Sequence, residues 1–110
     1  MLDIRLYMLQ RLSALVMVPF VLVHIAVMIY AVQDGLSAGE ILSRTQGSMF
    51  WFLFYGLFVI AVSVHGAIGL RVVAHEMLGL KDRVLTALTW GVGAVFLLLG
   101  GRAVVAVTLA

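Results

Sequence analysis

Three long apolar segments constrain the fold of this chain more than any other feature of its sequence. They cover residues 12–32, 49–70 and 84–101. A helix rises about 1.5 Å per residue, so about 20 residues cross the roughly 30 Å hydrocarbon core of a bilayer. The first two segments contain no charged residue, and the third reaches the required length when Arg102 extends its charge to the headgroups. Each segment is therefore predicted to be a membrane-spanning helix, which satisfies its own backbone hydrogen bonds in lipid.

Composition supports this interpretation. Only 11% of the residues are charged, whereas an ordinary soluble domain has about a quarter. The apolar segments are continuous and do not alternate with polar residues, which argues against the strands of a membrane β-barrel. We therefore predict an all-α integral membrane bundle of three transmembrane helices, forming a single domain over residues 1–110. The helices are expected near residues 9–32, 49–73 and 83–104.

The distribution of basic residues predicts the orientation. Three spans place the N-terminal segment and the second loop on the same side of the membrane. Five of the seven basic residues lie on that side: Arg5, Arg11, Arg71, Lys81 and Arg83. Only Arg44 and Arg102 lie on the other. Because loops rich in lysine and arginine stay in the cytoplasm, the N-terminus is predicted to be cytoplasmic.

Cysteine content and charge exclude several kinds of site. The sequence has no cysteine, so this chain by itself cannot form a disulfide or hold an iron–sulfur cluster through thiolates. Its net charge of +2 is too small to suggest that it binds nucleic acid. In the first loop, the sequence from Ser37 to Glu40 fits a capping box, which predicts a short interfacial helix. A plain polar connection is the alternative, and both remain open.

Two histidines, His24 and His65, lie inside predicted spans. An ionisable residue there is costly and by default marks a functional site that faces the interior of the bundle. A neutral imidazole nitrogen is a good axial ligand for haem iron. The alternative is a structural hydrogen bond from each histidine to a neighbouring helix.

The depths of the two histidines limit what they can share. His24 is 13 residues beyond Arg11, about 20 Å from the cytoplasmic boundary, whereas His65 is six residues before Arg71, about 9 Å from it. Two nitrogens that ligate one iron must be about 4 Å apart, given bonds of about 2 Å. One haem therefore cannot bind both histidines. If both are ligands, two haems lie at different depths, and each needs a second histidine from another chain.

The residues around His65 fit more than one role. Gly69 is one helical turn away on the same face, and Gly66 is adjacent. Missing side chains at these positions would leave room for a flat macrocycle, or would let helices pack closely. The third histidine of the chain, His75, is expected in the second loop, in contact with water or headgroups.

Two motifs carry a resemblance to a known family. Gln10-Arg11-Leu12-Ser13-Ala14 opens the first helix, and His65-Gly66-Ala67-Ile68-Gly69-Leu70-Arg71-Val72-Val73-Ala74-His75-Glu76 closes the second. With these motifs in this order, the chain resembles the small cytochrome b anchor subunits, C or D, of succinate dehydrogenase and fumarate reductase. The resemblance covers nearly the whole length of the chain.

The resemblance implies roles for five residues. His65 matches the axial haem b ligand, and His24 matches the first-helix ligand of the two-haem members. Arg11 matches an arginine that holds a haem propionate or lines the quinone pocket, and Ser13 is the accompanying hydroxyl. Glu76 stands where the family has an acid near the quinone. For Arg11 the alternative is simple snorkelling to the headgroups. For Ser13 it is a hydrogen bond back to its own helix.

Two departures from the family pattern leave the subunit type unassigned. D-type subunits often follow the acid with a tyrosine that binds quinone, but this chain has Met77. C-type subunits often have a histidine after the second arginine, but this chain has Val72. The details of the quinone pocket therefore stay open.

The resemblance also implies an assembly and a function. The chain would be a non-catalytic electron-transfer and anchor subunit, binding one or two haems b that it shares with a second membrane anchor. FAD and iron–sulfur clusters would belong only to the partner flavoprotein and iron–sulfur subunits, and quinone would be the substrate at the membrane. The expected location is a bacterial or archaeal cytoplasmic membrane in preference to the mitochondrial inner membrane. A membrane scaffold without haem, or a small transporter subunit, is the alternative.

Overall fold

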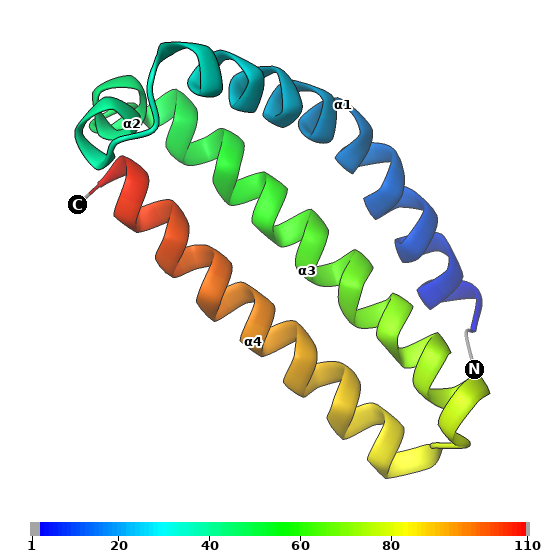
Figure 1. Ribbon diagram of the computed structural model, residues 1–110. Coiled ribbons are helices and arrows are strands. Elements are labelled where there is room, and N and C mark those ends of the chain that lie inside the picture. Colours follow the sequence, from blue (N-terminus) through cyan, green and yellow to red (C-terminus); the bar gives the residue numbers. More distant parts are fainter. Residues whose placement is uncertain (1–2, 110) are drawn as a thin grey trace.

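The structure is a computed structural model that describes residues 3–109. Over these residues the chain forms four helices: α1 (Ile4–Asp34), α2 (Ala38–Thr45), α3 (Met49–Leu78) and α4 (Asp82–Thr108). α1, α3 and α4 are long and apolar enough to cross a membrane. Figure 1 shows α3 between α1 and α4, with α2 at the end of the bundle near the C-terminus. The prediction of an all-α bundle with three spans is confirmed.

The long helices extend beyond the ranges that hydropathy suggested. α1 begins at Ile4 and not near residue 9, because the Asp3 carboxylate accepts a hydrogen bond from the Leu6 amide. α3 continues to Leu78 and not to about residue 73, and then ends at Gly79, whose φ of 69° is left-handed. Caps of these kinds end helices in polar surroundings. The apolar segments therefore mark what lies in lipid, whereas the caps determine where each helix begins and ends.

The first loop contains the interfacial helix that the capping box predicted. The Ser37 hydroxyl accepts a hydrogen bond from the Glu40 amide and donates one to the Glu40 carboxylate. α2 then packs against the end of α4, where the Thr45 hydroxyl donates to the Val107 carbonyl at 2.6 Å. The Gly47 amide donates to the Thr108 carbonyl at 2.7 Å. These bonds occupy carbonyls that the last turn of a helix leaves without partners.

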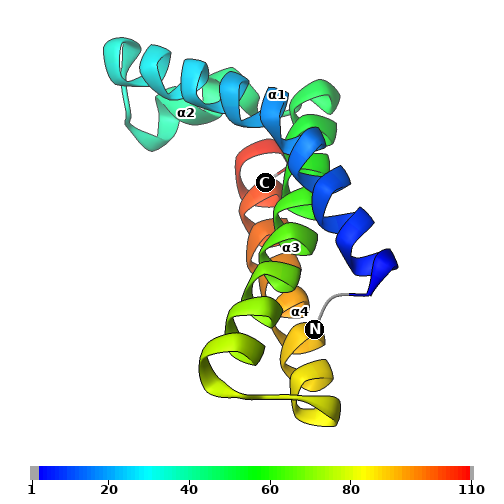
Figure 2. The same ribbon diagram turned by 90° about the vertical axis from the view of Figure 1, so that its right-hand side faces the viewer.

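α1 is bent, so its two halves lie at different distances from α4. Pro19 lies inside α1 and cannot donate a backbone hydrogen bond to the carbonyl of Leu15. The middle of α1 is held on α3 by Phe20, whose ring centroid is 4.9 Å from that of Phe54 and 5.9 Å from that of Phe58. In Figure 2 the C-terminal half of α1 turns outward toward α2. This divergence creates space between the helices on one side of the bundle.

α3 and α4 pack closely at glycines. A Cβ atom at Gly100 of α4 would lie 2.6 Å from Cγ1 and 3.0 Å from Cγ2 of Val59. Val59 is β-branched and has little rotamer freedom in a helix. The absent side chain at Gly100 therefore allows this contact. Gly101 is different, because nothing lies within 4 Å of the position its Cβ would occupy.

We expect Gly100→Ala to destabilise the protein by about 1–3 kcal/mol, because the added methyl overpacks the contact with Val59. Thermal unfolding in detergent should then show a lower midpoint. Gly101→Ala is the matched control, and it should leave the midpoint unchanged or raise it slightly through helix propensity. Equal effects of the two substitutions would contradict close packing at Gly100.

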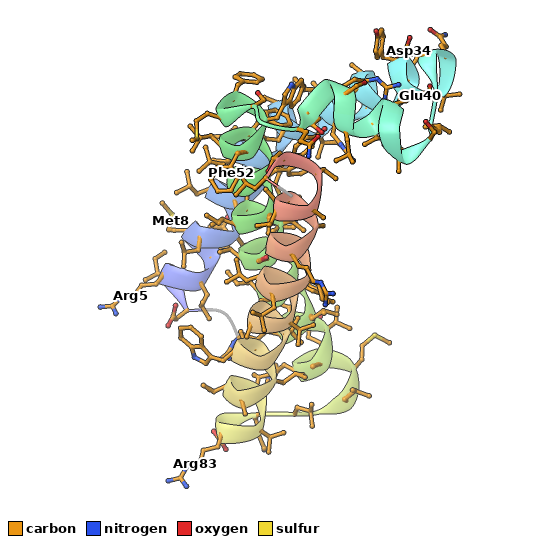
Figure 3. The ribbon with its side chains drawn as sticks, turned by 90° about the vertical axis from the view of Figure 1, so that its left-hand side faces the viewer. Arg5, Met8, Asp34, Glu40, Phe52 and Arg83 are labelled. Carbon is orange, nitrogen blue, oxygen red and sulfur yellow. The ribbon has the colours of Figure 1, made fainter. Side chains whose placement is uncertain are left out.

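The charged residues separate toward the two ends of the bundle. Figure 3 shows Asp34 and Glu40 at one end and Arg83 at the other, with Arg5 in the half nearer to Arg83. Beside Glu40, Arg44 forms an ion pair with Asp34 at 3.0 Å, so its charge is compensated. The basic N-terminal segment and the α3–α4 loop therefore lie in the same half of the bundle. The cytoplasmic location of that half stays a prediction.

Candidate functional site

His65 lies on the side of α3 that faces α1. Its Nδ1 atom is 3.3 Å from the hydroxyl oxygen of Ser13, which is buried in α1. The same hydroxyl donates to the backbone carbonyl of Gln10 at 3.0 Å. The fold thus brings together the two sequence motifs that carry the family resemblance. Both residues were candidates from the sequence, but their contact was not predicted.

The hydroxyl of Ser13 can join both partners at once. A serine hydroxyl has one hydrogen, and Ser13 donates it to the Gln10 carbonyl. Its oxygen can then accept a hydrogen from His65 when the ring carries that hydrogen on Nδ1. In a neutral imidazole the other nitrogen, Nε2, then carries the lone pair. A histidine that ligates a metal usually has this arrangement, with one nitrogen on the metal and the other donating to an acceptor.

A small apolar hollow of about 280 Å³ borders His65. Its other lining residues all come from α1: Ala14, Met17, Val18, Val21 and Leu22. The histidine is partly exposed, and the hollow is open to the outside of the bundle. A second chain packed against this face could therefore supply the opposite wall of the hollow.

The two glycines near His65 face side chains of neighbouring helices. A Cβ atom at Gly69 would lie 3.6 Å from Nε2 of Gln10, whose side chain comes from α1. A Cβ atom at Gly66 would lie 2.8 Å from the Phe96 ring of α4. At Gly66 the close Phe96 ring favours helix packing, whereas the contact at Gly69 is of ordinary length, and room for a flat macrocycle there stays a prediction.

His24 lies in a different environment from His65. Its ring meets those of Tyr55 and Phe58 nearly edge-on, with centroid distances of 5.9 and 5.5 Å. Its Nδ1 atom is buried and has no hydrogen-bond partner among the residues that the structure describes. A buried polar nitrogen without a partner is unfavourable in an apolar site. The chain by itself therefore leaves His24 without the partner that a purely structural histidine would have.

A large cavity of about 1120 Å³ lies beside His24. It occupies the space where the C-terminal half of α1 diverges, and residues of all four helices line it. The lining is mostly aliphatic and aromatic, with Arg44 and Thr45 contributed by α2. Ligand sites in proteins are commonly about 300–1000 Å³. The cavity therefore has room for a large apolar cofactor within reach of His24.

The two histidines line separate spaces. No residue that borders the hollow at His65 also borders the cavity at His24. Ser13, which contacts His65, and His24 are separated by roughly 16 Å along α1. This geometry gives no support to a single haem between them, as their depths in the sequence also indicated.

Arg11 and Glu76 lie apart from the contact between Ser13 and His65. Arg11 is exposed, and its guanidinium donates to the Tyr7 hydroxyl at 3.3 Å and lies 5.7 Å from the centre of that ring. On a regular helix it is roughly 200° around from Ser13, so it faces away from α3. Glu76 is also exposed, near the end of α3.

Two further polar side chains at this end of the bundle were not singled out from the sequence. The Gln10 amide oxygen is buried without a hydrogen-bond partner among the described residues. Arg71 donates to the Thr89 hydroxyl at 3.2 Å, while its Nε atom is buried and similarly unpaired within residues 3–109. Gln10 lies within the first motif and Arg71 within the second. Their positions in those motifs could have identified them as candidate site residues.

Comparison with known proteins identifies one family. Residues 2–101 match the family described as succinate dehydrogenase/fumarate reductase transmembrane subunit. The match includes Ser13, His24 and His65. No individual curated protein and no solved structure matches the sequence.

Proposed function

Because this chain belongs to the succinate dehydrogenase/fumarate reductase transmembrane subunit family, we propose that it is a haem b-binding anchor subunit of a succinate:quinone oxidoreductase. The chain is an integral membrane protein with three spanning helices, and its family forms part of an enzyme complex. Haem binding, a share in the quinone site and attachment of the soluble subunits are the proposed functions within that complex.

One observation carries the haem proposal. Inside a membrane span, His65 has its Nδ1 atom 3.3 Å from the Ser13 hydroxyl and its ring beside an apolar hollow. A neutral imidazole that donates from Nδ1 to Ser13 offers the Nε2 lone pair to a metal. A structural histidine would make the same hydrogen bond to the neighbouring helix α1, so this bond fits both roles. The apolar hollow that opens beside the ring is what supports iron ligation over packing.

His24 supports a second haem at the other end of the bundle. Its unpaired Nδ1, its aromatic neighbours and the adjacent cavity all suit a large apolar group that contains a metal ion. Each histidine would supply one imidazole ligand, and the second ligand of each haem would come from the partner anchor subunit. A bound haem supplies reversible one-electron oxidation and reduction. This chain supplies neutral ligands and low-dielectric surroundings.

The remaining motif residues suit the charged edge of this site. Arg11 projects from the exposed face of α1, where its charge can compensate a haem propionate or contact a quinone held between the two anchor subunits. Glu76, exposed near the end of α3, would lie toward the quinone and the soluble subunits. The flavoprotein with its FAD and the iron–sulfur subunit would bind at this end, on the cytoplasmic side of a bacterial or archaeal membrane.

Purification of the intact complex tests the proposed function. A reduced-minus-oxidised spectrum should show b-type haem bands, and a flavoprotein and an iron–sulfur protein should co-purify. A featureless spectrum without these partners would favour a scaffold or transporter subunit. Haem bands without the partners would contradict the proposed assembly but not the proposed haem binding.

A further inference from the structure

We propose that Ser13 is a positioning residue that holds the haem ligand His65 in one tautomer and one orientation. The inference rests on the proposed haem ligation by His65. Ser13 accepts the Nδ1 hydrogen, so that Nε2 keeps the lone pair for iron. This role differs from the propionate or quinone contact that the family resemblance implied for this hydroxyl.

The first step of the argument is the chain of hydrogen bonds. His65 Nδ1 lies 3.3 Å from the Ser13 oxygen, and Ser13 donates to the Gln10 carbonyl at 3.0 Å. A neutral ring that gives Nε2 to iron carries its hydrogen on Nδ1, so the Ser13 oxygen then accepts that hydrogen while Ser13 donates to Gln10. Were the histidine hydrogen on Nε2, the Ser13 hydroxyl would turn to donate to Nδ1, and the ring would have no lone pair left for iron.

Burial makes this constraint strong. Ser13 is 7% exposed, so water does not readily replace either of its bonds. Without Ser13, a ligating His65 would lose the acceptor of its Nδ1 hydrogen, and an unsatisfied buried polar group costs about 1–3 kcal/mol. Ser13 therefore stabilises the tautomer that can ligate iron through Nε2.

The same hydrogen bonds argue against a quinone contact. A hydroxyl that stabilises a quinone carbonyl must donate its hydrogen, and Ser13, 7% exposed, already has Gln10 and His65 as partners. The bond back to its own helix, which was the structural alternative from the sequence, is present together with the bond to His65. The helix bond thus orients Ser13, and Ser13 orients the ligand.

Ser63 provides a contrast within the same region of α3. It is also a buried serine that donates to a carbonyl of its own helix, that of Val59 at 2.7 Å. It lies two residues before His65. Substitution of Ser63 therefore removes a buried hydroxyl that is bonded to its own helix, but it keeps the hydrogen bond between Ser13 and His65.

Ser13→Ala in the intact complex tests the proposal. A ligating histidine whose other N–H donates to an acceptor is more basic and favours ferric iron. Loss of the acceptor should raise the midpoint potential of the His65 haem and weaken haem binding by about 10- to 100-fold. Ser13→Thr keeps the hydroxyl and should retain the original potential. Ser63 borders the cavity at His24, so its control is read on the His65 haem alone, whose potential Ser63→Ala should leave unchanged. Optical redox titration and haem-to-protein ratio are the measurements.

Each outcome decides the inference. An unchanged potential and haem content in Ser13→Ala would overturn the role of Ser13, as would the same shift in Ser63→Ala. If Ser13→Ala loses the haem completely, Ser13→Thr and Ser13→Val are compared, because they have nearly the same shape. Haem retained only with threonine supports the proposal, and equal loss in both variants contradicts it. If the unsubstituted complex contains no haem, the proposed function itself fails.

Discussion

Replacing His65 by alanine should remove one haem b from the purified complex. The substitution takes away an axial nitrogen, and alanine has no atom that can ligate iron. One component of the reduced-minus-oxidised spectrum and its step in a redox titration should disappear. The flavoprotein and iron–sulfur subunits should still co-purify if the three helices remain folded.

His75→Ala is the matched control for that experiment. His75 lies on the same helix, but its Nδ1 is 2.8 Å from the Leu80 carbonyl at the α3–α4 loop. Its loss should leave the haem-to-protein ratio unchanged. An unaltered spectrum in His65→Ala would count decisively against haem ligation by this residue. Equal haem loss in both variants would indicate a general folding defect of α3.

His24→Ala should remove a haem signal different from the one that His65 supports. The two residues line separate spaces, so neither substitution should remove the ligand of the other site. The residual haem in each single variant should have its own midpoint potential, and the double variant should retain neither. Potentiometric titration of the three variants measures this directly.

Phe58→Leu separates ligation from packing at His24. Phe58 contacts the His24 ring, so its substitution disturbs the packing while keeping the imidazole. Haem should then be retained, with at most a small change in potential. Unchanged haem content in His24→Ala would show that His24 is a structural residue of the aromatic cluster. Its unpaired nitrogen would then need another explanation.

The fold was predictable from the sequence because lipid imposes a simple requirement on the chain. Each span needs about 20 apolar residues and internal backbone hydrogen bonds, so the three apolar segments indicated three helices. The capping sequence at Ser37 indicated α2 for a similarly local reason. Helix ends were less predictable, because caps such as Asp3 and Gly79 extend α1 and α3 past the apolar segments.

The candidate site was only partly predictable. Distance along a helix indicates the depth of a residue, so His24 and His65 could be assigned to different levels. Depth also places Ser13 and His65 toward the same end of the bundle, but many residues share that end. Which of them meet depends on the rotation of α1 about its axis and on the side from which it packs on α3.

Sequence alone therefore determined the number of spans, the levels of the histidines and, through the two motifs, the family. Tertiary structure decided that Ser13 bonds to His65, that Gln10 and Phe96 pack at the glycines, and that the bend of α1 leaves a cavity at His24. The physical reason is that membrane thickness constrains position along the bilayer normal. Position around each helix is set by the shapes of side chains that meet between helices.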